Sequence, residues 1–315
     1  MSGENNSKLS RRRVLQAAIL AGVGTTMSGS LRAADDKSAI IYKAIPATGQ
    51  KLPVIGIGTN QFSDVDYNDV RDVLKRMHEM GGTVINTASA YRNSEVVIGK
   101  ALRELGLTDK MFMSTMFDIA GVTASKDPVS GKESVERSFD RLQKIDLMFI
   151  HLVVGVEKMM PILQDLKKQG RVRYIGITSV YHPSDDARAL EYLRKYPLDF
   201  VQLPYSLADR TAEKEFLPLA RERKIAVMAA VPFGGTRNLL FQKAANRQLP
   251  KWAADLDIAT WGQYFLKYAV SHPEVTCAVP GSTKINHLED NQGAGLGRLP
   301  NAAERKRMQE FWEHG

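Results

Sequence analysis

Short apolar runs alternate with longer amphipathic stretches along most of the chain. The short runs are rich in β-branched residues and predict strands over residues 54–58, 83–87, 111–115, 147–152, 173–178, 200–203, 225–230 and 275–279. The longer stretches carry apolar residues at three- and four-residue spacings, which predicts helices over residues 67–80, 94–105, 132–143, 157–169, 184–195, 213–223 and 258–271. The chain is therefore expected to fold into repeated strand-helix units.

Eight predicted strands with seven helices between them, and further helical sequence after the last strand, indicate an α/β fold, a closed (β/α)8 TIM barrel. An N-terminal β-hairpin is predicted over residues 40–45 and 52–55. A doubly wound open sheet shows the same alternation, but no G-x-G-x-x-G follows the first strand, where a dinucleotide-binding sheet carries it. No composition break divides residues 35–315, so one barrel domain is expected there.

Two features are expected in the C-terminal part of the chain. Residues 232–256 separate the seventh strand from its helix, and a connection of this length is typical of a functional lid. Asn301 followed by Glu304 is a capping pattern and predicts a final helix that continues through Trp312.

The first 34 residues have the order of an export signal. Ser10-Arg11-Arg12-Arg13-Val14-Leu15-Gln16 precedes a weakly apolar stretch over residues 17–27 and a small-residue end at Ala33-Ala34. This order resembles a twin-arginine signal, which implies the twin-arginine export machinery as a partner and a periplasmic or other extracytoplasmic location in a bacterium. The apolar stretch is shorter than the roughly 20 residues that span a bilayer, so no stable membrane anchor is expected. A disordered basic arm is the alternative.

The charge balance changes this picture little. The formal net charge is +8, but residues 1–34 hold five basic residues and one acidic residue, so half of the excess lies there. The other basic residues are scattered apart from Arg305-Lys306-Arg307, so we expect no nucleic-acid partner, and an anionic cofactor suits the mild excess better. Cys277 is the only cysteine, which excludes an intrachain disulfide, and its apolar strand marks it as a small core residue.

In a (β/α)8 barrel the functional side chains lie at the C-terminal ends of the strands. Four polar or polarisable residues lie at these ends: Asn86 and Tyr91 at the second predicted strand and its loop, Met116 after the third, and His151 ending the fourth. Further polar or glycine-rich positions follow strands five to eight, among them Thr178, Ser179, Gln202 and the run from Gly281 to Lys284. These strand ends are the expected site.

The sequence around these same positions resembles that of a known protein family. Residues 85–102 read I-N-T-A-S-A-Y-R-N-S-E-V-V-I-G-K-A-L and are similar to the aldo/keto reductase segment D-T-A-x-x-Y-G-x-S-E-x-x-I-G-K-A-L. Three further blocks match that family in the same order, at residues 146–151, 174–179 and 279–291. The resemblance spans roughly residues 40–291 and implies a barrel enzyme that transfers hydride between a nicotinamide nucleotide and a small carbonyl or alcohol substrate.

The resemblance also implies catalytic roles. Tyr91 stands at the proton donor and His151 at the residue that orients the carbonyl, but the family's Asp position holds Asn86 and its Lys position holds Met116. Loss of one member of a buried ion pair costs about 3 to 5 kcal/mol, whereas replacing both leaves a stable neutral pocket. A phenol with a pKa near ~10 still donates a proton at neutral pH, although without a nearby cation the reaction should be slower.

The cofactor implied by the resemblance is NADP(H), with NAD(H) left open because His287 stands near a usual Arg. Ala230 replaces the family's stacking Tyr, and Phe233 is the partial substitute. An exported enzyme loaded in the cytoplasm would need to hold its cofactor tightly. The residues expected to bind it are Gly58, Thr59, Thr178, Ser179, Gln202, Phe233, Gly234, Ser282, Thr283, Lys284 and Asn291.

Three functions follow from these observations. The leading hypothesis is an exported oxidoreductase with an altered set of catalytic residues. The alternative is a barrel that binds a ligand or nucleotide without hydride transfer. A Cu(I) site at Met116 and His151 is a minor third, because thioether and imidazole suit Cu(I). Two ligands are too few, and His182 would have to add a third, so no metal site is predicted.

Overall fold

The computed structural model of the chain describes residues 38–117, 131–179, 183–235 and 239–314. The expected export signal in residues 1–34 and the loop residue His182 therefore lie outside the described residues. Among the described helices, none has the length and apolar character needed to cross a membrane.

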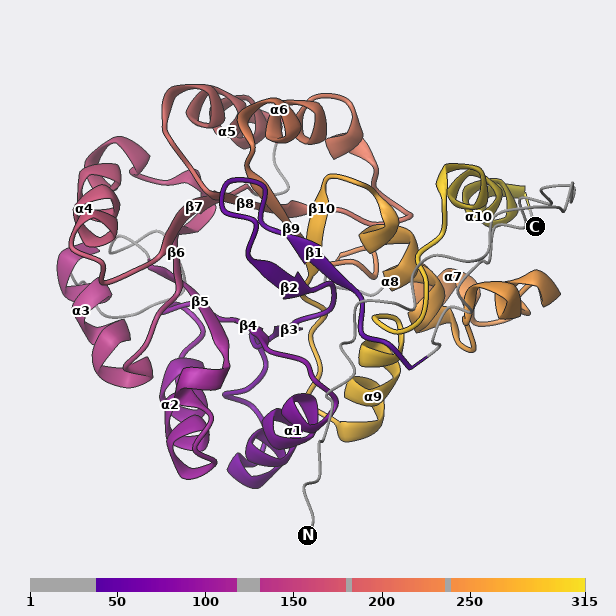
Figure 1. Cartoon of the computed structure of the whole chain (residues 1–315), viewed down its shortest axis with the longest axis horizontal. Helices are drawn as coiled ribbons and strands as arrows, with labels where there is room; N and C mark the ends of the chain where they lie inside the picture. Colours follow the sequence, from indigo (N-terminus) through magenta and orange to yellow (C-terminus); the bar gives the residue numbers. More distant parts are fainter. Residues whose placement is uncertain (1–37, 118–130, 180–182, 236–238, 315) are drawn as a thin grey trace, which may run out of the picture. The chain divides into compact units, whose positions relative to one another are not determined.

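A ring of eight parallel strands forms the centre of the fold (Figure 1). Neighbours in the sheet follow chain order from first to last. The strands are β3 (Ile57–Gly58), β4 (Val84–Asn86), β5 (Phe112–Phe117), β6 (Leu147–Ile150), β7 (Tyr174–Thr178), β8 (Phe200–Pro204), β9 (Ala226–Ala230) and β10 (Val275–Ala278). The predicted (β/α)8 barrel is confirmed.

The ring closes between its first and last strands. Isolated parallel bridges join Ile55 to Ala278 and Gly58 to Gly281. The Gly58 amide donates to the Pro280 carbonyl at 2.9 Å. A Cβ atom at Gly58 would lie 2.8 Å from the carbonyl oxygen of Val279, closer than side chains tolerate. Glycine is therefore the residue that lets the two edges approach.

Seven helices follow the strands on the outside of the ring, close to the predicted ranges. They are α1 (Tyr67–Glu79), α2 (Ser94–Glu104), α3 (Gly131–Leu142), α4 (Val156–Lys168), α5 (Pro183–Lys195), α6 (Phe216–Arg223) and α8 (Trp261–Ser271). Each predicted range is matched within one residue at both ends, except that the last two helices begin three residues late, behind the short 3-10 helix η3 (Thr211–Glu213) and the N-cap residue Thr260.

The N-terminal hairpin closes one end of the barrel (Figure 1). Strands β1 (Tyr42–Ala44) and β2 (Lys51–Pro53) pair antiparallel, as predicted. The turn between them has Gly49 in the left-handed region at φ +75, and its amide donates to the Ile45 carbonyl. Ile45 and Leu52 pack with the side chains that fill the barrel lumen. The hairpin thus leaves the C-terminal strand ends as the open face.

Alternation along each strand divides the core into two layers. On β5, Phe112 and Met116 belong to the lumen cluster, whereas Met113 and Phe117 pack outward against the helices. Cys277 is fully buried in the lumen cluster, and burial raises the pKa of its thiol to about 12. Its predicted role as a core residue is confirmed. The prediction that Met116 follows the third strand is wrong, because Met116 lies inside β5.

The long connection after β9 has secondary structure of its own. Its described part holds α7 (Leu239–Ala244) and the 3-10 helix η4 (Lys251–Leu256). Both pack on α8 and on the last helix, α10 (Ala302–His314), through an aromatic cluster that includes Trp261 and Trp312. The lid role stays a prediction. The cap of α10 is confirmed, since the Asn301 side chain accepts from the Glu304 amide and Glu304 accepts from the Asn301 amide.

A buried lysine joins this region to the barrel. Lys267 of α8 is fully buried, and its ammonium donates to the carbonyls of Leu256, Leu296 and Arg298 at 2.8 to 3.0 Å. One side chain therefore fixes the end of η4 and the loop that follows α9 (Ile285–Gly293).

We predict that Lys267→Met lowers the free energy of unfolding by about 3 kcal/mol or more, because three carbonyls lose a buried donor worth roughly 1 kcal/mol each. Lys306→Met, at an exposed position of α10, should change it by less than about 0.5 kcal/mol. Urea denaturation of both variants measures the difference. Equal stability of the two variants would contradict the anchoring role.

Candidate functional site

A cavity of about 530 Å³ opens at the C-terminal ends of the strands. Seven predicted site residues line it: Gly58, Thr59, Asn86, Tyr91, Gln202, Phe233 and Asn291. The other lining residues are Asn60, Gln61, Ala230, Val231, Pro232, Gly235, Phe241, Val279, Gly281, His287 and Asp290. Because β3, β4, β8, β9, the loop after β10, α7 and α9 all contribute, the cavity spans much of one end of the barrel.

Eight predicted residues do not line this cavity: Met116, His151, Thr178, Ser179, Gly234, Ser282, Thr283 and Lys284. Several of them already have hydrogen bonds within the protein, including Ser282, whose hydroxyl donates to the Lys284 carbonyl at 3.1 Å. The Thr178 hydroxyl accepts from the Leu152 amide at 2.8 Å, and the Ser179 hydroxyl donates to Asp186 at 2.7 Å. Lys284 is exposed at the N-cap of α9, beside the cavity-lining Gly281. A bound anion at that end would meet the positive end of the helix dipole.

The floor of the cavity is a pair of side-chain amides. Asn86 at the end of β4 and Gln202 on β8 are 2% and 7% exposed. The Asn86 amide nitrogen donates to the Gln202 amide oxygen at 3.3 Å, and the Gln202 nitrogen donates to the Asn86 oxygen at 3.2 Å. The two residues face each other across the lumen and form a neutral, reciprocal pair.

Ser114 of β5 supports this pair from below and was missed by the sequence analysis. It is fully buried opposite Asn86 in the β4-β5 register. Its hydroxyl donates to the Ile85 carbonyl at 2.9 Å and accepts from the Asn86 amide nitrogen at 3.0 Å. Met116 follows two residues later on the same face, in the apolar lumen cluster. The floor is therefore uncharged throughout.

Tyr91 lines the cavity beside this floor, and His151 contacts its ring. Their rings meet edge to face, with centroids 6.2 Å apart and planes at 84°. Tyr91 is half-buried against the lumen cluster, and burial raises the pKa of its phenol. His151 corrects the sequence analysis, because it does not end a strand but opens the 3-10 helix η2 (His151–Val153). A Tyr91 proton is therefore held at neutral pH, next to an imidazole.

Backbone strain gathers around the same residues. Leu152 and Val153 have φ of 60 and 49, directly after His151. Arg92, after Tyr91, and Val231, which lines the cavity, have φ of 50 and 45. Left-handed φ is costly for non-glycine residues and concentrates at functional sites, where packing enforces it.

The remaining side of the cavity comes from α9. Asp290 accepts hydrogen bonds from the Thr260 hydroxyl at 2.8 Å and from the Gln263 amide at 3.1 Å. These contacts tie α9 to the start of α8. Asp290 and Phe241 were not predicted, because the first reads as an ordinary helix residue and the second lies in the long connection.

The described residues offer little support for a metal centre. No group of three or more His, Cys, Asp and Glu residues in the described ranges is arranged to hold a metal ion. Met116 is 1% exposed within the apolar lumen cluster. The Cu(I) hypothesis gains nothing from its position.

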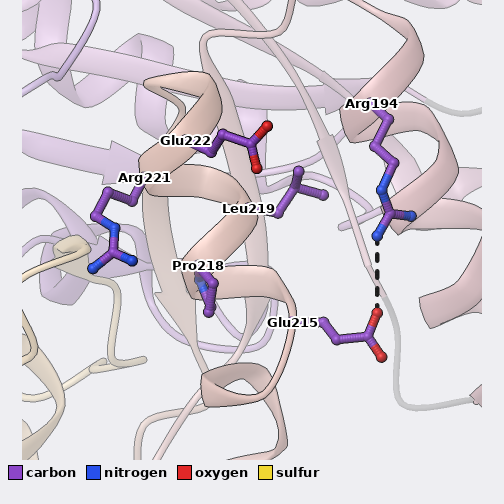
Figure 2. A pocket seen from close by; sticks show the side chains of 6 residues that line it. All are labelled: Arg194, Glu215, Pro218, Leu219, Arg221 and Glu222. Carbon is purple, nitrogen blue, oxygen red and sulfur yellow. Dashed lines mark ion pairs between the residues drawn. The ribbon is translucent and has the colours of Figure 1, made fainter.

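A second hollow lies on the outer helix layer, away from the strand ends. Residues of α5 and α6, and Glu215 just before α6, line it: Arg194, Glu215, Pro218, Leu219, Arg221 and Glu222 (Figure 2). Arg194 and Glu215 form an ion pair across it at 3.9 Å, and both side chains are more than half exposed, at 58% and 65%. An exposed pair of this kind contributes at most about 1 kcal/mol. We assign this hollow no function.

Comparison with known proteins agrees with the fold. The sequence profile of the aldo/keto reductase family matches residues 54–313. The chain therefore belongs to the aldo/keto reductase family. It is 30% identical over 286 residues to aldo-keto reductase str7 of Strobilurus tenacellus, which covers 78% of this chain and 83% of that protein.

Solved structures show the same barrel. An aldo-keto reductase of Bacillus halodurans in its holo form superposes with a TM-score of 0.71 at 22% identity, covering 87% of this chain and 96% of that one. An aldo/keto reductase of Klebsiella pneumoniae in complex with NADP and acetate gives a TM-score of 0.67 at 23% identity, covering 84% and 93%.

We predict that the neutral floor rejects a single charge. Asn86→Asp and Met116→Lys should each lower the free energy of unfolding by about 3 kcal/mol or more, because each places an unpaired ion in a buried site. The double variant should recover at least about 1 kcal/mol of the summed loss, since the two charges compensate each other.

Denaturation of the single and double variants at neutral pH measures this coupling. Asn68→Asp, in the exposed first turn of α1, is the matched control and should be near neutral. Strictly additive losses would show that the two positions do not interact.

Proposed function

We propose that this chain is an oxidoreductase that uses a nicotinamide nucleotide, NADP(H) in preference to NAD(H), to interconvert a carbonyl and an alcohol. One observation carries the proposal: Tyr91, with His151 at its ring edge, lines the same strand-end cavity as the amide floor. Family membership and the NADP complex of the Klebsiella pneumoniae structure support this assignment.

The residues in the cavity fit such a cofactor. The Gln202 amide retains one hydrogen and one lone pair after its bonds to Asn86, which match the oxygen and nitrogen of a carboxamide. The ring centroids of Phe233 and Phe241 lie 4.8 Å apart. Both rings line the cavity and give it an aromatic face, although the family's stacking Tyr is replaced by Ala230. Ser282, Thr283 and Lys284 precede or cap α9, where a phosphate group finds free backbone amides.

When bound, a nicotinamide nucleotide supplies or accepts the hydride. The chain's own residues position the substrate and handle the proton. The Tyr91 hydroxyl donates a hydrogen bond to the substrate oxygen and releases its proton as the alcohol forms. We assign His151, which contacts the Tyr91 ring, the role of orienting that oxygen through Tyr91.

The proposed set of catalytic residues is altered, because Asn86 and Met116 stand at the family's Asp and Lys positions. No described residue lining the cavity is a Lys or an Arg, so nothing cationic there lowers the pKa of the Tyr91 phenol. Burial instead raises that pKa, and the tyrosinate is poorly stabilised. We expect slow proton transfer and a rate that holds steady as the pH rises from 7 to 9, since the phenol stays protonated.

We predict that Tyr91→Phe lowers kcat/KM for carbonyl reduction by about 100-fold or more, the usual contribution of a general acid. Nucleotide affinity should stay within about twofold. Loss of NADPH absorbance with a panel of carbonyl compounds measures turnover. Tyr67→Phe, on the outer helix α1, is the matched control and should leave kcat/KM unchanged.

The rival proposal is a barrel that binds a ligand or nucleotide without hydride transfer, and the uncharged floor favours it. An Asn86→Asp, Met116→Lys double variant separates the two. Turnover by the native protein supports the oxidoreductase. Turnover by the double variant alone supports the binding barrel. If the native protein binds neither NADP(H) nor NAD(H), both the oxidoreductase proposal and the cofactor assignment are wrong.

We further propose that residues 1–34 direct export of the folded, cofactor-loaded protein. Arg11→Lys with Arg12→Lys should reduce the exported fraction at least about tenfold in a bacterial host, because the twin-arginine machinery reads the arginine pair. Cell fractionation and immunoblotting measure it, with Arg32→Lys as the control outside the pair. Unchanged export in the double variant would leave the segment without this role.

A further inference from the structure

Ser114 determines which way the amide floor faces. Its hydroxyl hydrogen is directed to the backbone carbonyl of Ile85, which can only accept. Its oxygen is therefore an acceptor toward Asn86, and the Asn86 nitrogen must point at it.

The orientation of Asn86 in turn sets that of Gln202. The Asn86 amide nitrogen donates one hydrogen to the Ser114 hydroxyl oxygen and the other to the Gln202 amide oxygen. The Asn86 oxygen accepts from the Gln202 nitrogen. A joint flip of both amides would preserve their mutual bonds but would force the Ser114 hydroxyl to abandon either Ile85 or Asn86. The observed orientation is thus favoured by one hydrogen bond.

We propose that Ser114 is a positioning residue for cofactor recognition. By fixing the polarity of the Asn86-Gln202 pair, it fixes where the cavity presents the spare hydrogen and the spare lone pair of Gln202. This determines the orientation in which a carboxamide is bound. Ser114 is fully buried below the pair and does not line the cavity, so it acts only through Asn86. The inference rests on the proposed binding of a nicotinamide nucleotide.

Two ligands isolate this role. NADP⁺ carries the carboxamide, whereas 2′-phospho-ADP-ribose is the same molecule without the nicotinamide. Ser114→Ala leaves one buried hydrogen of the Asn86 amide without its acceptor, which favours the flipped floor, so the dissociation constant of NADP⁺ should rise about three- to tenfold as the competent orientation becomes the minor one. The dissociation constant of 2′-phospho-ADP-ribose should stay within twofold, because that ligand does not use the floor.

Calorimetric titration of the full chain measures both constants. Ser114→Thr keeps the hydroxyl and should restore NADP⁺ affinity. Ser138→Ala removes a different fully buried serine hydroxyl, one that donates to the Ser134 carbonyl within α3, and should change neither constant. In a Gln202→Leu background, Ser114→Ala should have no further effect on NADP⁺.

The outcomes separate the two proposals. If the native chain binds NADP⁺ and Ser114→Ala weakens both ligands equally, or weakens neither, the positioning role is wrong and the cofactor assignment stands. If the native chain binds neither ligand, the cofactor assignment fails and the positioning role fails with it.

Discussion

Closure of the sheet between β3 and β10 is the constraint on which the site depends. Asn86 and Gln202 stand 116 residues apart and on strands that are not neighbours in the sheet. Their amides meet only because the sheet curls into a ring and turns both side chains into one lumen. The close approach at Gly58, where a Cβ would strike the Val279 carbonyl, makes that ring possible. A local backbone requirement at one strand thus governs a contact that crosses the lumen of the barrel.

The chemistry above the floor follows from its neutrality. A buried ion pair would place charge in the floor, whereas here the floor is ordered by hydrogen bonds between the uncharged side chains of Asn86, Ser114 and Gln202. Such bonds are directional, but neutral groups stabilise the loss of the Tyr91 proton much less than a nearby cation would. The site therefore keeps geometric order while losing the field that would stabilise a tyrosinate. Strained backbone directly follows both Tyr91 and His151, and such backbone persists only where the surrounding packing enforces it.

The sequence predicted those features that depend on local pattern. The strands, the outer helices, the hairpin and the Asn301-Glu304 cap were visible because periodicity and capping act over a few residues. The positions of Met116 and His151 relative to their strands were predicted wrongly: Met116 lies inside β5 and His151 lies after β6. Strand ends depend on pairing with neighbouring strands, which a single segment of sequence does not reveal. Ser114 escaped notice because alternation marks it only as inward-facing. Its role appears once the bond to Ile85 fixes the donor, and no pattern along the chain records that.

The amide floor also bears on how this chain can change over generations. A change to a charged ion pair in the floor requires substitutions at two positions, Asn86 and Met116, and either substitution alone produces a protein with an isolated buried charge. Selection acting on stability would remove such intermediates before the second change arose. The neutral floor is thus a local optimum that is hard to leave by single steps. Lineages that carry it are expected to diversify through the cavity walls, such as the α7 and α9 faces, while the floor stays fixed.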